Sequence, residues 1–125
     1  MIDFQNKLLF KLKPESIQAG LAVVRELLIE NEYVIDSYVS FRDRVVFTNK
    51  RVISVNVQGI SGKKVDYTSM PYNKIQAYSV ETSGTFDLDA ELEIWISQVG
   101  KVRFEIKGSA NIVKLCKTIS ELILN

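Results

Sequence analysis

Two runs of alternating apolar and polar residues, joined by a short polar turn, stand at the centre of the chain. Residues 41–55 read as two strands connected at Asn49 and Lys50. Asparagine suits a tight hairpin loop because it tolerates a positive φ better than most residues. In the second strand the apolar positions alternate with polar ones, Ile53, Val55 and Val57 with Ser54, Asn56 and Gln58. This period of two predicts a hairpin with one buried face.

The same alternation predicts five more strands. With the hairpin strands at 42–48 and 51–58, the full set covers residues 33–40, 64–70, 75–82, 88–97 and 102–106. The connections are short and carry Gly, Pro or Ser, which is typical of an antiparallel meander. We therefore expect a mainly β protein with seven strands between residues 33 and 107.

Two segments carry the spacing of helices instead. Apolar residues recur every three or four positions over residues 15–31, after Pro14, and Asn31 is a reasonable C-terminal stop. A second apolar stripe runs through residues 109–124. Such a stripe has to be buried, and the open end of a bent sheet is the available partner. Residues 1–13 are expected to be an irregular or extended lead-in.

Composition limits the kinds of protein that this chain can be. Its 125 residues suffice for one domain, residues 1–125, with a core that needs no disulfide or metal. The net charge of +1 gives no argument for nucleic acid, and no apolar run is long enough to span a membrane. Histidine is absent, which removes His-dependent triads and most zinc or iron sites. We expect no cofactor and no metal.

The single cysteine indicates the compartment. Cys116 cannot form an internal disulfide, and the N-terminus lacks the apolar core of a signal peptide. These features fit a cytoplasmic protein. Because Cys116 lies on the apolar stripe of the last helix, we expect a buried and inert thiol.

Four carboxylates gather on one side of the strand at 88–97. We call the following set the acidic face: Asp87, Asp89, Glu91, Glu93 and Trp95. Neighbouring carboxylates on one strand face lie roughly 6.5–7 Å apart. A divalent cation site or an acid/base pair is one interpretation; a solvated face, or one matched to cations on a neighbour, is the other. Trp95 is expected to be covered by the N-terminal helix or by a neighbouring subunit.

The opposite charge lies earlier in the chain. We call this set the basic face: Arg42, Arg44, Lys50, Arg51, Lys63 and Lys64. Residues 41–70 hold these six cations against two acids, whereas residues 75–100 hold five acids and no cation. A head-to-tail contact between the two regions would close into a ring if the rotation permits. Alternatively, the charges simply alternate on wet strand faces. Near Lys63, the loop at 59–64 lacks the glycine, the following Ser or Thr, and the helix that a phosphate-binding loop requires.

Several short sequences, in this order, resemble the bacterial pleckstrin-homology family, over about residues 17–123. They are Arg42-Asp43, Phe47-Thr48-Asn49-Lys50-Arg51, Gln58-Gly59-Ile60-Ser61-Gly62-Lys63-Lys64, Pro71-Tyr72, Ile75, Glu81-Thr82 and Gly84-Thr85-Phe86-Asp87-Leu88-Asp89-Ala90-Glu91-Leu92. The resemblance implies a bent seven-stranded sheet capped by a C-terminal helix. It also implies no catalytic activity and a tendency to form cyclic homo-oligomers.

These observations lead to one expected function and one alternative. We expect a non-catalytic binding and assembly module that presents a surface, as a homo-oligomeric ring, to a protein partner. The alternative is peripheral binding of an anionic lipid or other anionic ligand through the basic face. Eukaryotic pleckstrin-homology domains place one basic residue on the first strand and a pair on the second; Arg42 and Arg44 supply the pair, but residues 33–41 contain no Lys or Arg. No nucleic acid partner is expected.

Overall fold

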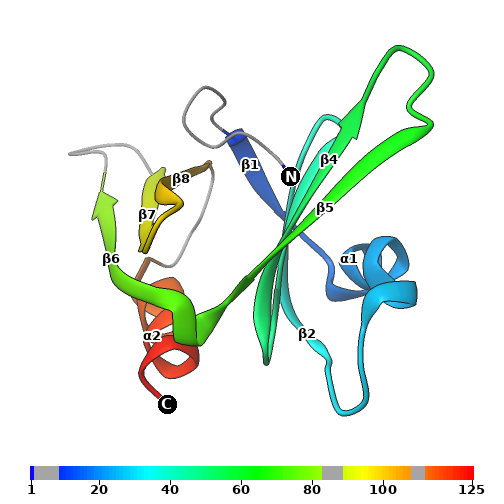
Figure 1. Cartoon of the computed structure of the whole chain (residues 1–125). Helices are drawn as coiled ribbons and strands as arrows, with labels where there is room; N and C mark the ends of the chain where they lie inside the picture. Colours follow the sequence, from blue (N-terminus) through cyan, green and yellow to red (C-terminus); the bar gives the residue numbers. More distant parts are fainter. Residues whose placement is uncertain (2–8, 83–88, 108–111) are drawn as a thin grey trace.

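The computed structural model describes residues 1, 9–82, 89–107 and 112–125 (Figure 1). Eight strands are present in these ranges: β1 (Leu9–Glu15), β2 (Val34–Ser40), β3 (Asp43–Thr48), β4 (Arg51–Gln58), β5 (Lys64–Pro71), β6 (Ile75–Thr82), β7 (Ala90–Ile96) and β8 (Gly100–Ile106). The helices are α1 (Ile17–Val24) and α2 (Ile112–Leu124), with short 3-10 turns η1 (Arg25–Leu27) and η2 (Tyr72–Lys74). The seven strands expected from the alternation are all present.

All eight strands join one strongly bent sheet in the order β5-β4-β3-β2-β1-β8-β7-β6. Every neighbouring pair is antiparallel except β1 and β8, which run parallel. The strand β1 therefore ties the β2–β5 half of the sheet to the β6–β8 half, and the two halves lie on either side of it in Figure 1.

Within the irregular or extended lead-in expected over residues 1–13, residues 9–13 are extended and belong to β1, a strand that the alternation did not predict. Its sequence gave little sign of a strand because Lys11, Lys13 and Pro14 interrupt the apolar residues. Hydrogen bonds to neighbouring segments hold this strand although its own sequence does not favour one. Lys13 lies opposite Val39 on β2, and the Lys107 N–H donates to the Leu12 carbonyl at 2.7 Å. Leu12 is fully buried, which fixes this strand in the core.

The main core fills the inside of the bend. Its buried side chains come from both halves of the sheet and include Tyr38, Phe47, Leu92 and Phe104. The helix α2 adds Leu115 and Ile119 to this core, and the Tyr78 hydroxyl donates to Ser120 Oγ at 2.9 Å. The prediction that the last helix caps the sheet is confirmed.

A second, smaller core lies on the outer face of the β2–β5 half, under α1. Val24 of α1 packs there with Val46, Ile53 and Val55. The helix approaches closely at Gly20, where a Cβ atom would lie 2.3 Å from Ser37 Oγ. Because α1 covers one face and the main core the other, β4 is buried on both faces from Val52 to Asn56. The expectation of a single buried face on this strand is therefore wrong.

The helix α1 is shorter than the predicted segment 15–31. It begins after Ser16, whose Oγ accepts a hydrogen bond from the Ala19 N–H at 3.1 Å. The chain leaves helical geometry after Leu27, and Asn31 adopts a φ of 65°. The loop that follows is held by Glu32, whose carboxylate accepts the Ile29 N–H at 3.0 Å. The helix therefore ends earlier than the apolar spacing indicates, and a local hydrogen bond holds the loop that follows it.

Asn49 stabilises the β3–β4 turn through its side chain rather than through a positive φ. The Tyr33 N–H donates to Asn49 Oδ1 at 2.9 Å, and Asn49 Nδ2 donates to the Asn31 carbonyl at 3.0 Å. The Thr48 hydroxyl accepts the N–H groups of Lys50 and Arg51, each at 3.0 Å. The turn is thereby linked to the loop before β2.

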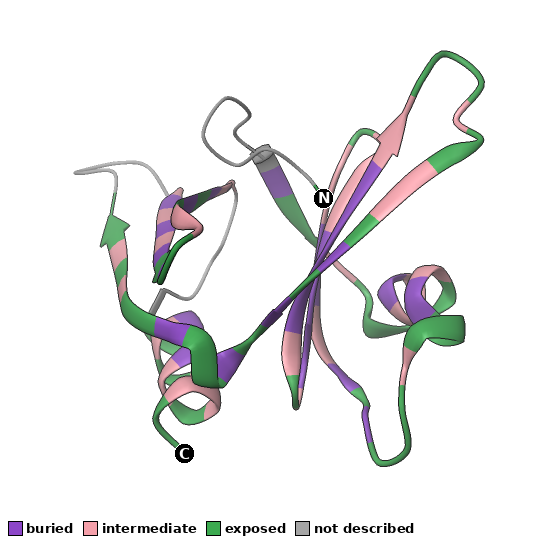
Figure 2. Ribbon diagram, in the orientation of Figure 1, coloured by how far each residue is buried: buried purple, intermediate pink, exposed green. Residues whose placement is uncertain are grey.

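Burial follows this arrangement, with buried residues where the sheet halves meet and exposed residues on the β4–β5 loop (Figure 2). Within the described ranges, neither helix has the length and apolar character needed to cross a membrane.

Candidate interaction surfaces

The acidic face is paired with cations of the neighbouring strand. Asp89 lies 3.9 Å from Lys107 Nζ, and Glu93 lies 3.7 Å from Lys101 Nζ and 3.2 Å from Arg103 Nε. Glu91 accepts a hydrogen bond from Arg103 Nε at 2.6 Å. Hydrogen bonding to Glu91 and attraction to its charge raise the pKa of the Arg103 guanidinium.

The three described carboxylates of this face are therefore matched to cations within the same subunit. The count of charged residues over 75–100 did not include these partners, because all three cations lie just beyond Gly100. Asp87 lies outside the described residues. No group of three or more Asp, Glu, Cys or His side chains in the described ranges could hold a metal ion.

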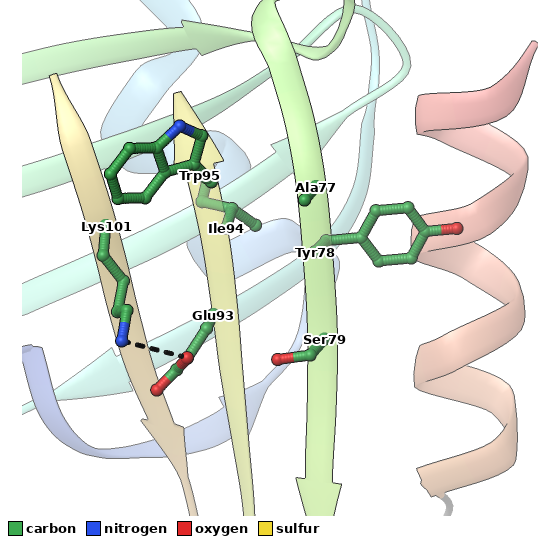
Figure 3. Close-up of a pocket in the computed structure, with 7 residues that line it drawn as sticks. All are labelled: Ala77, Tyr78, Ser79, Glu93, Ile94, Trp95 and Lys101. Atoms are coloured by element: carbon green, nitrogen blue, oxygen red, sulfur yellow. Dashed lines mark ion pairs between the residues drawn. The ribbon is translucent and has the colours of Figure 1, made fainter. Parts of the chain in front are cut away.

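Trp95 borders a shallow hollow on the outer face of β6, β7 and β8 (Figure 3). The hollow has a volume of about 150 Å³, and Ala77, Ser79, Glu93 and Lys101 also line it. Ala77 lies directly opposite Trp95, so a small side chain leaves one side of the indole open. The neighbouring Tyr78 points the other way, toward α2.

Trp95 itself is 47% exposed. The expectation that the N-terminal helix covers it is wrong, because α1 packs on β2 in the other half of the sheet. The hollow is bordered by the indole of Trp95, the small side chain of Ala77 and the Glu93–Lys101 ion pair. These features fit a single side chain better than a substrate.

The basic face is divided between the two ends of β4. Lys50 and Arg51 lie at its start, while Lys63 and Lys64 follow its end. Arg42 belongs with the second group, since its Nη2 donates to the Gly59 carbonyl at 2.6 Å. Arg44 lies between them and pairs with Glu15 at 3.0 Å. The six cations expected to form one face therefore do not form a continuous surface.

Arg51 has a structural environment. Its Nε and Nη2 donate to the two oxygens of Glu32, each at 2.9 Å, and Nη2 also donates to the Leu27 carbonyl at 2.7 Å. Nη1 donates to Ser69 Oγ at 2.9 Å. Because each nitrogen of its guanidinium has a partner, Arg51 links η1, the loop before β2, and β5.

The Glu32 carboxylate is fully buried, and the Thr48 hydroxyl donates to it at 2.7 Å. Burial alone would raise its pKa. Hydrogen bonds from Arg51, the Ile29 N–H and Thr48 outweigh burial and hold the pKa of Glu32 below its usual value. Nothing in the sequence pattern around Glu32 indicated this buried pair.

The loop between β4 and β5 is a glycine-containing turn, as the sequence indicated. Gly59 and Gly62 have φ values of 75° and 69°, a region that favours glycine. The loop leads into a strand, so the helix N-terminus of a phosphate-binding loop is missing. Cys116 is partly buried on α2.

The sequence profile described as "Bacterial PH domain" matches residues 3–123, nearly the whole chain. The chain belongs to the bacterial PH domain family. PH stands for pleckstrin homology, so this is the family that the sequence resembles. PH domains are typically non-catalytic binding modules.

Individual relatives and solved structures are similar to this chain over most of its length. The chain is 40% identical over 115 residues to the uncharacterized protein YjqA of Bacillus subtilis (strain 168), covering 90% of each chain. A DUF1696 family protein with a pleckstrin-homology domain from Shewanella loihica PV-4 is 38% identical, with a TM-score of 0.78, covering 90% of this chain and 97% of that one. A pleckstrin homology domain from Shewanella amazonensis SB2B is 41% identical, with a TM-score of 0.67, covering 89% and 90%.

Sequence analysis missed two apolar residues of this bacterial PH domain that stand out in the structure. Phe41 lies in the β2–β3 turn and Ile60 in the β4–β5 loop, and both are exposed. A signal was present, because each is an apolar residue in a predicted turn with cations close by in sequence.

Proposed function

We propose that this bacterial PH domain is a non-catalytic module that assembles head-to-tail with copies of itself and presents the assembled surface to a protein partner. The observation that carries the proposal is the free edge of β6. Within the described ranges, no strand pairs with the outer side of β6, which ends the sheet.

Free sheet edges are usually protected by Lys, Pro, bulges or a covering element, since they otherwise pair with other chains. The strand β6 is eight residues long and contains no Lys, Arg or Pro; its one charge is Glu81. The helix α2 lies against its inner face at Tyr78 and leaves Ala77 and Ser79 exposed. Such an edge fits a protein that pairs in its working state.

The strand β5 at the opposite end of the sheet offers a complementary edge. It begins at Lys64 and ends at Pro71, and Tyr67 is exposed on its outer face. Glu81 is the only charge on β6. On β5, Asp66 pairs with the Met1 ammonium at 2.9 Å, which leaves Lys64 to face Glu81 across the contact. Because six of the seven neighbouring pairs are antiparallel, β5 and β6 run in the same direction, and a second copy that continues the sheet would pair its β5 parallel to β6.

The hollow at Trp95 supports this contact. It lies one strand in from the β6 edge, next to Ala77, where it can receive a side chain from an incoming strand. Aromatic residues are enriched in protein interfaces and contribute strongly when they become buried.

Solution mass tests the proposal. Light scattering and native mass spectrometry should find an oligomer at low salt and a smaller species at high salt, since salt screens the charged edges. Ser79→Lys on β6 and Tyr67→Lys on β5 each place a charge at an exposed position of an edge strand and should lower the mass. Ser97→Lys, at an exposed position in the β7–β8 turn, is the matched control and should leave the mass unchanged. A monomer at all concentrations would remove the proposal.

A second candidate function is the binding of an anionic ligand at the end of β4. Arg42, Lys63 and Lys64 gather there, and none of them forms an ion pair with another described residue. Titration with inorganic pyrophosphate, followed by NMR, tests a site for soluble anions. Lys63→Glu with Lys64→Glu should abolish the shifts, whereas Lys50→Glu should not.

A further inference from the structure

The outer face of β6, β7 and β8 is not covered by either described helix. The helix α1 packs on β2, and α2 lies against the inner face, where the Tyr78 hydroxyl donates to Ser120 Oγ at 2.9 Å. On the outer face, Trp95 is 47% exposed and points away from α2 (Figure 3). Exposed aromatic residues on a bare surface are typical of sites that bind other proteins.

The register of these strands arranges the outer side chains in rows. Each row takes one residue from β6, β7 and β8 in turn: Ala77, Trp95 and Lys101; Ser79, Glu93 and Arg103; Glu81, Glu91 and Glu105. The first row borders the hollow, and the third consists of glutamates only. The distance between these two rows along β7 is roughly 13 Å. The hollow and the glutamate row are therefore separate attachment points on one face.

Negative charge exceeds positive charge on this face. Its described carboxylates are Glu81, Asp89, Glu91, Glu93 and Glu105, and its cations are Lys101, Arg103 and Lys107. Arg103 pairs with Glu91 and Glu93, whereas Glu81 and Glu105 form no ion pair with another described residue. Like charges directly opposite each other on neighbouring strands destabilise a sheet. A cation supplied by a partner would relieve this repulsion.

The hollow decides which cation fits. Its volume of about 150 Å³ lies below the roughly 300–1,000 Å³ of small-molecule pockets and suits one side chain. An apolar occupant would take water from the Glu93 carboxylate without replacing its hydrogen bonds. A guanidinium is planar and weakly hydrated, stacks on an indole and bonds well to a carboxylate. Lys101 contacts Glu93 at 3.7 Å with a side chain that is 54% exposed, so a partner displaces it at small cost.

We propose that this face binds a basic segment of a partner protein, with one arginine stacked on Trp95 in the hollow and a second arginine over the glutamate row. An extended chain spans the distance between these points in about four residues, which sets the spacing of the two arginines. Because the incoming strand of a second copy would use the same hollow, the partner segment competes with assembly. That competition rests on the proposed function, whereas binding to a single subunit does not.

Fluorescence tests the binding on a single subunit. Tyr67→Lys is expected to block the β5 edge, and it leaves the outer face of β6, β7 and β8 unaltered. The probe is a synthetic peptide with two arginines separated by three glycine or serine residues. The emission of Trp95, the only tryptophan, should change on titration, and added salt should weaken the binding.

Two altered peptides test the recognition. Lysine in place of both arginines should lower the affinity by about threefold or more, because an ammonium does not stack on the indole. Placing the two arginines next to each other should lower it by a similar factor, since only one of the two points is then reached. Equal affinity of the lysine peptide would overturn the stacking in the hollow.

Calorimetry with the arginine peptide tests the residues of this face in the Tyr67→Lys background. Trp95→Leu removes the stacking surface, and Ala77→Leu fills the hollow from the opposite strand. Each should lower the affinity by about fivefold or more. Glu81→Gln with Glu105→Gln removes two charges from the glutamate row and should lower the affinity by about threefold or more.

A matched control lies beside α1. Glu26→Gln with Glu30→Gln also removes two exposed carboxylates, but neither residue lies on the proposed face. The affinity should stay within about twofold of that before the change. A loss equal to that of Glu81→Gln with Glu105→Gln would show general attraction between opposite charges and overturn the proposal.

Native mass spectrometry of the unaltered chain tests the competition. Excess arginine peptide should convert the oligomer to smaller species. An oligomer that keeps its mass, while Tyr67→Lys binds the peptide, overturns the competition. If the unaltered chain is a monomer at all concentrations, assembly and the competition both fail, and the titrations still decide the binding of the peptide. Absence of any response to the peptide in fluorescence and calorimetry overturns the proposal, whatever the mass of the chain.

Discussion

Removing the cation from the Glu32–Arg51 pair should destabilise the fold strongly. Arg51→Met keeps most of the side-chain volume but leaves the Glu32 carboxylate, which is fully buried, without its two charged hydrogen bonds of 2.9 Å each. The Leu27 carbonyl and Ser69 Oγ lose donors as well. Breaking one side of a buried pair costs about 3–5 kcal/mol.

We expect the lower end of this range, about 3 kcal/mol, because the Arg51 side chain is 21% exposed and water can reach part of the site. For a chain of 125 residues, this corresponds to a decrease in Tm of about 10 °C. Since domains of this size are stable by only about 5–15 kcal/mol, a large share of the stability would be lost.

Urea unfolding followed by circular dichroism measures the change. Arg103→Met removes an exposed ion-pair partner and serves as the control, with an expected midpoint close to that of the unaltered chain. Adding Glu32→Leu to Arg51→Met removes the unpaired carboxylate and should recover part of the loss. If Arg51→Met unfolds at the same urea concentration as the unaltered chain, the buried pair contributes nothing and the reasoning fails.

Three further predictions concern packing, pH and assembly. Gly20→Ala should destabilise the fold by about 1–3 kcal/mol because its Cβ would lie 2.3 Å from Ser37 Oγ; thermal unfolding checks this, and Ser37→Gly should relieve it. Because the pKa of Glu32 is lower in the folded chain than in the unfolded one, its stabilising contribution is complete above about pH 4.3 and is lost as the pH falls through the folded value. Urea midpoints at several acidic pH values should fall less in Glu32→Gln than in the unaltered chain. Trp95 is the only tryptophan, so its emission should shift to shorter wavelength as concentration rises and assembly covers the hollow; an emission maximum independent of concentration would contradict this contact.

Alternation allowed most of the sheet to be predicted from the sequence. The strands β4 and β6 match the expected residues at both ends, and Leu92, Ile94 and Ile96 are buried as their period of two indicated. The C-terminal helix was equally clear, because its apolar stripe could be satisfied only by burial against the sheet.

The parts that could not be predicted depend on contacts between distant segments. The strand β1 is fixed by β2 and β8 on its two sides rather than by its own alternation. Glu32, in the loop between η1 and β2, is held by bonds to Arg51 at the start of β4. The spacing of apolar and polar residues reflects local preference only, so neither of these long-range contacts could be predicted from it.

The candidate surfaces were predicted less well for a related reason. Counts of charged residues along the chain do not show which cations face which carboxylates. The ion pairs of the acidic face with Lys101, Arg103 and Lys107 were therefore not predicted. The basic face was treated as one surface although β4 places its members at opposite ends. Exposure of Phe41 and Ile60 became visible only when both loops were placed at one end.

The parallel contact between β1 and β8 has a consequence for how the chain reaches its folded state. Leu12 lies beside Ile106, so the two partners are separated in sequence by most of the domain. During synthesis β1 must wait, with one side unsatisfied, until the final strand leaves the ribosome. Long-range pairing of this kind slows folding and prolongs the exposure of strand edges. We therefore expect the closing of this seam to limit the folding rate, and early association between unfinished chains to be the main competing event.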